Sequence, residues 1–230
     1  MERHYEITDS ETIVKNIFNE EDIKMFDHLL HKMLGFSDDI ELDDNLKETP
    51  KRYLKLWTEM TSGYREDPKK YLQKCFPVNS PNLADDSEVF DEEATDAIYR
   101  NGIVMVSTDA WSNCCHHLAP MHGRIYVAYI PNKKVVGLSK IVRAVKAYGK
   151  RLNLQEQWMA NIADAMMEVL EPLGVVVAGV GFIHSCVSMR GASEQTSATD
   201  TIAVRGIFTE NPNAKAEVLS MIANAEAHRN

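Results

Sequence analysis

The spacing of apolar residues changes near residue 100, and this change limits the folds open to the 230-residue chain. Before it, apolar side chains recur at helical intervals in residues 11–35 and again after Pro50. After it come four runs of β-type composition, at 102–107, 124–130, 175–189 and 199–208. Two helical segments separate the second run from the third. This order predicts an α+β fold, because an α/β fold would alternate single strands with single helices.

Local signals predict where several helices begin and end. Gly35 is expected to end the first helix, and Pro50 suits the first turn of the next one. Ser139 is the expected N-cap of a helix that runs to about Tyr148. A longer helix is expected over residues 154–171, where apolar side chains step by three or four.

Charge is distributed unevenly along the chain. Residues 1–100 hold 13 Lys+Arg and 24 Asp+Glu, whereas residues 101–230 hold 12 and 10. We therefore predict an acidic, mainly helical N-terminal region over 1–100 and a second domain over 101–230, with a loop or charged helix at 77–97. An anionic ligand would bind the second region. The net charge of −9 argues against a nucleic-acid partner, since phosphate backbones require a basic face.

Hydropathy argues against a membrane protein. No apolar run approaches the roughly 20 residues that a membrane helix needs. The N-terminal residues are polar and lack the apolar core of a signal peptide. We expect a cytoplasmic protein whose four cysteines are thiols or metal ligands rather than disulfides.

Four metal-ligand residue types stand in a row at Cys114-Cys115-His116-His117. Zinc prefers tetrahedral sites built from Cys thiolate and His nitrogen, so the run indicates a zinc site. The alternative is a reactive cysteine pair beside two chance histidines. A purely structural zinc site would require a second pair of ligands at finger-like spacing, and no second Cys-x-x-Cys occurs in the sequence.

A second candidate segment is His184 to Arg190, within the expected strand 175–189. Alternate residues of a strand share a face, so His184, Cys186, Ser188 and Arg190 are expected to point the same way. A solvated polar face is the alternative. Combined with the first segment, these residues supply more ligands than one zinc ion needs. Three protein ligands with one open position are typical of a catalytic zinc, whose bound water has a pKa of about 7.

Two pairs of residues on the predicted helices suit a nucleotide. Lys140 and Arg143 are one turn apart near a helix N-terminus, which favours anions, so they form a candidate phosphate clamp. Gln155 and Glu156 could pair with the N–H edge of guanine. The ordinary interpretations are a solvated basic face for the first pair and an acidic helix start for the second.

These segments belong to a series of motifs that occur in a fixed order. They are Cys-x-His-His-x-x-Pro-x-x-Gly (114–123), Val-Ala-Tyr-Ile-Pro (127–131), Gly-Leu-Ser-Lys-Ile-x-Arg (137–143), Leu-Gln-Glu (154–156), His-x-Cys-Val (184–187) and Thr-Ser-Ala-Thr (196–199). The series resembles the zinc-dependent class of GTP cyclohydrolase I. The resemblance covers about residues 45–210 and begins with Glu48-Thr49-Pro50-x-Arg52.

The resemblance implies a tunnelling fold, in which an antiparallel sheet carries helices packed on one side and follows an N-terminal helical extension. It implies that subunits assemble into a barrel, as a homodecamer with active sites between subunits. The implied reaction converts GTP and water into 7,8-dihydroneopterin triphosphate and formate, the first step of pterin, folate or deazaguanine biosynthesis.

The resemblance also implies a role for each matched residue. Zinc would be held by Cys114, His117 and Cys186. The acid/base histidines would be His116 and His184. Glu156 would anchor guanine with Gln155 beside it. The ribose and triphosphate would meet Ser139, Lys140, Arg143, Arg190 and Arg52, with Arg52 supplied by another subunit.

The chain departs from the family pattern at two positions. Cys115 stands where the family usually has Glu, so it could compete as a ligand, form a disulfide with Cys114 or be tolerated. Arg205 replaces a small uncharged residue, and nothing in the sequence explains it.

Two alternative functions are a related zinc enzyme that stops at a formylated or cyclic-phosphate product, and a non-catalytic zinc-binding assembly. A zinc deaminase would need His-x-Glu and Pro-Cys-x-x-Cys, which the sequence lacks.

Overall fold

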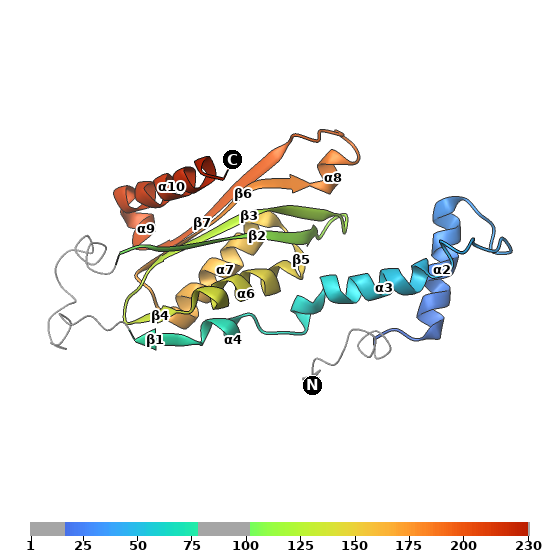
Figure 1. Ribbon diagram of the computed structural model, residues 1–230, viewed down its shortest axis with the longest axis horizontal. Coiled ribbons are helices and arrows are strands. Elements are labelled where there is room, and N and C mark those ends of the chain that lie inside the picture. The colour runs from blue at the N-terminus through green and yellow to red at the C-terminus, as the bar shows by residue number, and fades with distance from the viewer. Residues whose placement is uncertain (1–16, 78–101, 230) are drawn as a thin grey trace. The chain divides into compact units, whose positions relative to one another are not determined.

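The computed structural model describes residues 17–77 and 102–229 (Figure 1). The chain divides into two compact units, Met1–Arg65 and Glu66–Asn230. The second unit includes residues 66–77, which the charge pattern had grouped with the N-terminal region. The predicted domain boundary at residue 100 and nearly all of the expected loop or charged helix at 77–97 lie outside the described residues.

In the first unit, helix α2 spans Glu20–Leu34. It begins there because the side chain of Asn19 accepts hydrogen bonds from two N–H groups of the first turn, in a capping box with Asp22. Residues 18 and 19 are not helical, so the expectation of one helix over 11–35 is wrong at its start. The expected stop is confirmed, because Gly35 has a φ of 74°, a conformation that favours glycine.

Helix α3 spans Thr49–Met60 and has Pro50 in its first turn, as predicted. The 3₁₀ turn η1 (Ser62–Tyr64) follows it. Phe26 of α2 stacks on Tyr53 of α3 with ring centroids 4.7 Å apart, so an aromatic contact holds the two helices of this unit together.

The second unit is built on a five-stranded sheet of order β5-β2-β3-β6-β7. Its strands are β2 (Val104–Cys114), β3 (Pro120–Ile130), β5 (Leu152–Asn153), β6 (Gly174–His184) and β7 (Ala198–Gly206). Neighbours are antiparallel except for β2 and the two-residue β5. A separate antiparallel pair joins β1 (Cys75–Pro77) to β4 (Lys134–Val136).

The described residues of this unit also form six helices. They are α4 (Lys69–Leu72), α6 (Leu138–Gly149), α7 (Gln155–Leu170), α8 (Ser185–Ser188), α9 (Ile207–Glu210) and α10 (Pro212–Ala227). No described helix is both long enough and apolar enough to cross a membrane. The helix expected over 154–171 is confirmed to within one residue at each end.

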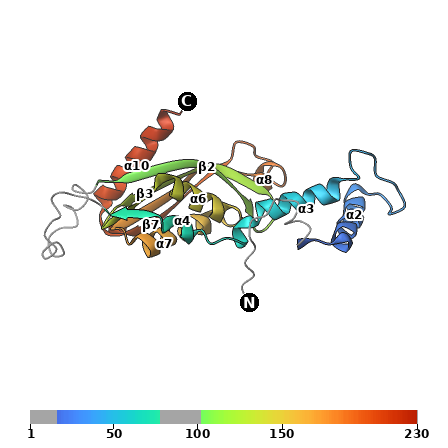
Figure 2. The same ribbon diagram turned by 60° about the horizontal axis from the view of Figure 1, so that its bottom comes forward.

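Both faces of the sheet are buried, and the alternation in β3 shows this directly. Residues of β3 that pack under α6 and α7 are Ile125, Val127 and Tyr129. Residues of β3 that pack against α9 and α10 are Tyr126, Ala128 and Ile130. Figures 1 and 2 show α10 on the side of the sheet away from α6 and α7. The α+β fold is therefore as predicted, but the expectation of helices on one side only is wrong.

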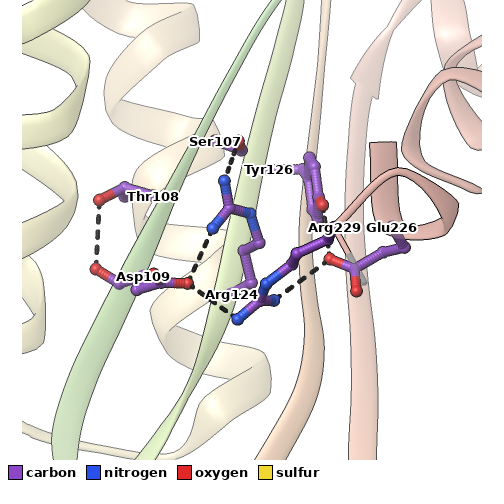
Figure 3. Close-up of polar contacts among 7 residues, drawn as sticks. All are labelled: Ser107, Thr108, Asp109, Arg124, Tyr126, Glu226 and Arg229. Carbon is purple, nitrogen blue, oxygen red and sulfur yellow. Dashed lines mark hydrogen bonds and ion pairs between the residues drawn. The ribbon is translucent and has the colours of Figure 1, made fainter. Parts of the chain in front are cut away.

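A network of charges ties the end of α10 to the sheet (Figure 3). Arg124 of β3 donates to Asp109 of β2 at 2.9 Å, and Arg229 pairs with the same carboxylate oxygen at 3.4 Å. Glu226 of α10 accepts a hydrogen bond from the Tyr126 hydroxyl at 2.5 Å and pairs with Arg229 at 3.5 Å. The C-terminal helix is thus held at its end by side chains of two strands.

Two local expectations are wrong. Ser139 does not cap α6, because the extended Gly137 is the N-cap and its carbonyl accepts from Lys140 N–H at 2.8 Å. The run 175–189 is not one strand, because β6 ends at His184 and the chain turns into α8.

Candidate metal centre and active site

A tight turn between β2 and β3 positions the first ligands. Cys114 ends β2, and its N–H donates to Ala119 O while its carbonyl accepts from Leu118 N–H, both at 2.9 Å. Leu118 takes a φ of 54°, so the chain reverses sharply here. The reversal sets His117 over Cys114, with 3.8 Å between Nδ1 and Sγ.

Asn153 of β5 supports this turn from inside the protein. Its backbone carbonyl accepts from Cys115 N–H at 3.1 Å. Its buried side-chain amide donates to Ser112 Oγ at 2.8 Å and to Tyr148 O at 2.9 Å. We did not identify Asn153 from the sequence. The only signal was a polar residue between two predicted helices.

The single turn of α8 brings in the third ligand. Strands β2 and β6 are both antiparallel to β3, so Cys114 and His184 lie at the same end of the sheet (Figure 1). After His184, Met189 N–H donates to Ser185 O at 2.9 Å, which closes a helical turn. This turn replaces the strand alternation expected for His184, Cys186, Ser188 and Arg190.

The ligand atoms of Cys114, His117 and Cys186 all lie within 4.8 Å of one another. Two ligands of a tetrahedral zinc with bonds of about 2.3 and 2.0 Å lie about 3.6 Å apart, close to the 3.8 Å between Cys114 and His117. Cys114 is buried, Cys186 is half-buried and His117 is exposed, so the cluster opens toward solvent on the histidine side. This donor set and spacing fit a metal ion.

Protonation of the thiols also reflects this arrangement. Burial raises the pKa of Cys186, and the neighbouring Cys114 thiol raises it further. A bound cation reverses this effect, because it favours thiolates and releases their protons.

His184 lies beside the cluster and is held by Gln155. Its Nε2 is 2.7 Å from Gln155 Oε1. Burial lowers the pKa of His184, and the nearby Glu156 carboxylate opposes that shift in part. The imidazole is therefore predominantly neutral at neutral pH.

The other sequence-predicted residues at this end of the sheet are exposed. His116 lies in the turn itself, with its ring centroid 6.2 Å from that of His117. Glu156 occupies the first turn of α7, and Arg190 follows α8. The charge of Glu156 acts on His184 and that of Arg190 acts on Cys186, so both charged groups lie near the metal cluster.

Three residues predicted to contact phosphate lie away from the metal cluster of this chain. Ser139, Lys140 and Arg143 occupy the start of α6, which follows β4 at the far end of the sheet from α8 and β5 (Figure 1). The helix of 12 residues, about 18 Å long, ends at Gly149 against Trp111 O. One chain alone therefore does not bring these residues to its metal cluster.

The remaining predicted or unexplained residues can also be placed. Arg52 is exposed on α3 of the first unit. The Cys115 side chain is exposed and does not belong to the metal cluster. Arg205 now has an explanation, because its Nε donates to Asp164 Oδ1 at 2.6 Å and joins β7 to α7.

The fold and the site define an α+β protein with a candidate transition-metal centre at one end of its sheet and a half-buried histidine beside it. Comparison with known families is specific: the model of GTP cyclohydrolase I matches residues 26–223. The chain belongs to the GTP cyclohydrolase I family.

Curated relatives agree with this membership. GTP cyclohydrolase 1 of Geobacillus kaustophilus is 43% identical over 180 residues, 78% of this chain and 85% of that protein. GTP cyclohydrolase 1 of Campylobacter curvus is 42% identical over 179 residues, 78% and 84% of the two chains. GTP cyclohydrolase 1 of Campylobacter jejuni is 36% identical over 206 residues, 90% and 98% of the two chains.

Proposed function

We propose that this protein is a GTP cyclohydrolase I, which converts GTP and water into 7,8-dihydroneopterin triphosphate and formate. Family membership supports the substrate and the reaction class. The observation that carries the proposal is the convergence of Cys114, His117 and Cys186 within 4.8 Å of one another, with the half-buried His184 close in the chain to Cys186. Such a cluster suits a metal-assisted hydrolysis in which neighbouring imidazoles move protons.

The proposed cofactor is Zn²⁺, held by Cys114, His117 and Cys186. When bound, zinc supplies a water of pKa near 7 for attack on C8 of the purine. His116 and His184 flank the ligands in sequence and take or give protons as the imidazole ring of guanine opens. A neutral His184 is ready to accept a proton, which agrees with the lowered pKa of its imidazole.

Substrate orientation is assigned to charged residues around the cluster. Glu156 is exposed, and its charge acts on His184, so its carboxylate can accept hydrogen bonds from the N–H edge of guanine while C8 faces the metal. Arg190 follows α8 directly and pairs with a phosphate. By resemblance to the family, Arg52 of another copy of the chain is a further phosphate contact.

The start of α6 is proposed to serve the site of a second copy of the chain. Ser139, Lys140 and Arg143 cannot reach the metal cluster of their own chain, but a neighbouring subunit could present its cluster to them. In the described residues, Lys140 and Arg143 form no ion pair, so both cations remain free for an anion. A homo-oligomer, a decamer by resemblance to the family, follows from this arrangement.

The main test is incubation of metal-loaded protein with GTP, with and without a chelator, and identification of products by mass and by pterin fluorescence after oxidation. We expect dihydroneopterin triphosphate and formate, lost on chelation and restored by zinc. A formylated product would instead identify an enzyme that stops early. Untouched GTP with zinc-loaded protein would contradict the proposed function.

Mixing two variants tests the shared site. Cys186→Ser removes a metal ligand and Arg143→Met removes a phosphate contact, so each alone should be inactive or nearly so. In 1:1 hetero-oligomers formed by unfolding and reassembly, about a quarter of sites would combine an intact cluster with an intact clamp. No recovery of activity would contradict a site shared between copies.

A further inference from the structure

Gln155 is a polar residue inside the core beside the proposed active site. Its side chain is only 3% exposed, at the first turn of α7. Its amide contacts three groups on two strands: Nε2 lies 3.0 Å from Thr199 O and 3.1 Å from Thr201 Oγ1, and Oε1 lies 2.7 Å from His184 Nε2. The amide therefore joins β7 to the last residue of β6.

The partners determine which way the amide points. The backbone carbonyl of Thr199 can only accept a hydrogen bond, so the NH₂ group of Gln155 must face it. The amide oxygen then faces His184, and an oxygen can only accept. His184 must consequently donate from Nε2, which places its proton there and leaves the lone pair of the neutral ring on Nδ1.

Little of the amide is left to bind a substrate. Both N–H bonds of Gln155 are used by Thr199 and Thr201, and the oxygen is used by His184. The amide fits closely, because a Cβ added at Gly179 would lie 3.3 Å from its Nε2. Gly179 pairs with Thr201 across β6 and β7, so glycine leaves the space in which the amide sits.

We propose that Gln155 is a positioning residue, which holds His184 with its proton on Nε2 and its lone pair on Nδ1, and does not contact guanine. The inference rests on the proposed function, because it assigns His184 a proton-transfer role in that reaction. It changes the role implied by family resemblance, which put Gln155 beside the guanine anchor. A fixed tautomer ensures that one defined nitrogen faces the reacting atoms in every turnover.

Steady-state kinetics with GTP separate the two roles. Gln155→Met keeps the length of the side chain and removes its polar atoms. We expect kcat to fall about 100-fold, the scale of a misplaced general acid or base, while KM for GTP changes less than about threefold. Gln157→Met is the matched control, since Gln157 lies on the exposed side of the same helix turn and bonds Asn161 at 2.9 Å. The control should leave both constants unchanged.

A second pair of variants leaves Gln155 in place. Thr201→Val keeps a β-branched residue in β7 but removes the hydroxyl that accepts from the amide, whereas Thr201→Ser keeps the hydroxyl. We expect Thr201→Val to lower kcat about three- to tenfold and Thr201→Ser to retain nearly full activity. This pair keeps the inference testable if Gln155→Met does not fold.

The tautomer itself can be measured without turnover. In zinc-loaded protein with ¹⁵N-labelled histidine, the ring nitrogens of His184, assigned with His184→Gln, should show a proton on Nε2. Gln155→Met should shift the population toward Nδ1. An unchanged tautomer in Gln155→Met would overturn the inference.

The kinetic outcomes distinguish this inference from the proposed function. A KM raised more than tenfold at unchanged kcat would make Gln155 a substrate contact and overturn the positioning role, while the proposed function stands. Wild-type protein that does not convert GTP would overturn the proposed function. The tautomer measurement would then still decide whether Gln155 orients His184.

Discussion

Two polar clusters on the same sheet differ in what their members do to one another. In the Arg124 network, which comprises Arg124, Asp109, Arg229 and Glu226, two arginines pair with two carboxylates of the same chain, so opposite charges lie side by side (Figure 3). In the cluster of Cys114, His117 and Cys186, burial raises the pKa of the Cys186 thiol and the neighbouring Cys114 raises it further, so the thiolate of Cys186 is disfavoured.

This difference is the one expected between a structural cluster and a candidate metal site. The charges of the Arg124 network neutralise one another, so it holds α10 on β2 and β3 without any added group. The metal cluster is unfavourable in its ionised form until a cation arrives, because the protein supplies only ligands. Ionisable side chains that disfavour the charged form of a neighbour are typical of a binding site. Side chains of opposite charge that pair with one another are typical of a structural contact.

The largest expected effect comes from removing a ligand. Cys186→Ser replaces a thiolate with a hydroxyl that binds zinc poorly, so we expect turnover of GTP to fall at least about 1000-fold. Bound zinc per chain, measured by elemental analysis after dialysis, should fall in parallel. The circular dichroism spectrum should remain that of the wild type.

Cys115→Ser is the matched control for this variant. Cys115 is adjacent to a ligand in sequence, but its side chain is exposed and outside the cluster. Zinc content and turnover should therefore stay within about twofold of the wild type. If Cys115→Ser lost zinc as Cys186→Ser does, the assignment of the three ligands would be wrong.

Disruption of the Arg124 network should lower the free energy of unfolding and leave the turnover of GTP unchanged. Arg124→Met removes the hydrogen bonds to Asp109 and Ser107. Because Asp109 is largely exposed, solvent screens the ion pair, and we expect a loss of about 1 kcal/mol in the free energy of unfolding. The thermal midpoint should fall by about 3 °C, with turnover per folded molecule unchanged.

Lys134→Met provides the comparison for Arg124→Met. Lys134 of β4 lies 3.9 Å from the exposed carboxylate of Glu171 and takes part in no such network. Its replacement should change stability by less than about 0.5 kcal/mol. If Arg124→Met abolished turnover at normal stability, the division between a structural and a functional cluster would fail.

The residues of the metal cluster were easier to predict from the sequence than the backbone conformation that brings them together. Residue types left more candidate ligands than one zinc ion needs, and the family resemblance selected Cys114, His117 and Cys186. The structure brings these three together. The expected strand through residue 189 was wrong, because the apolar pattern of β6 continues past His184 although the backbone turns into α8. One helical turn contains too few residues for its period to be read.

Residues that act through tertiary contacts were the hardest to predict. Asn153 and Gln155 are buried amides whose roles depend on carbonyls and hydroxyls distant in sequence. The helices α9 and α10 were not predicted, although the strong N-cap Asn211 followed by Pro212 marks the start of α10. The family motifs end at Thr199, and α9 and α10 contain none of them, so the sequence motifs did not predict the second buried face of the sheet.

The smallest effect is expected where the chain departs from its family next to a ligand. Cys115→Glu restores the residue that the family usually carries. The Cys115 backbone N–H bonds Asn153 O at 3.1 Å, a contact that does not depend on the side chain, and the side chain is exposed. A glutamate can therefore extend into solvent without moving Cys114 or His117. We expect GTP turnover within tenfold of the wild type and unchanged zinc content.

The same variant measures how far the metal cluster extends. A new carboxylate near the ligands favours the protonated form of nearby imidazoles, so it should shift the lower limb of the kcat pH profile slightly toward higher pH. A loss of activity beyond tenfold, with zinc retained, would show that Cys115 has a role of its own in turnover. The group of residues needed for turnover would then include Cys115 beside the three proposed ligands.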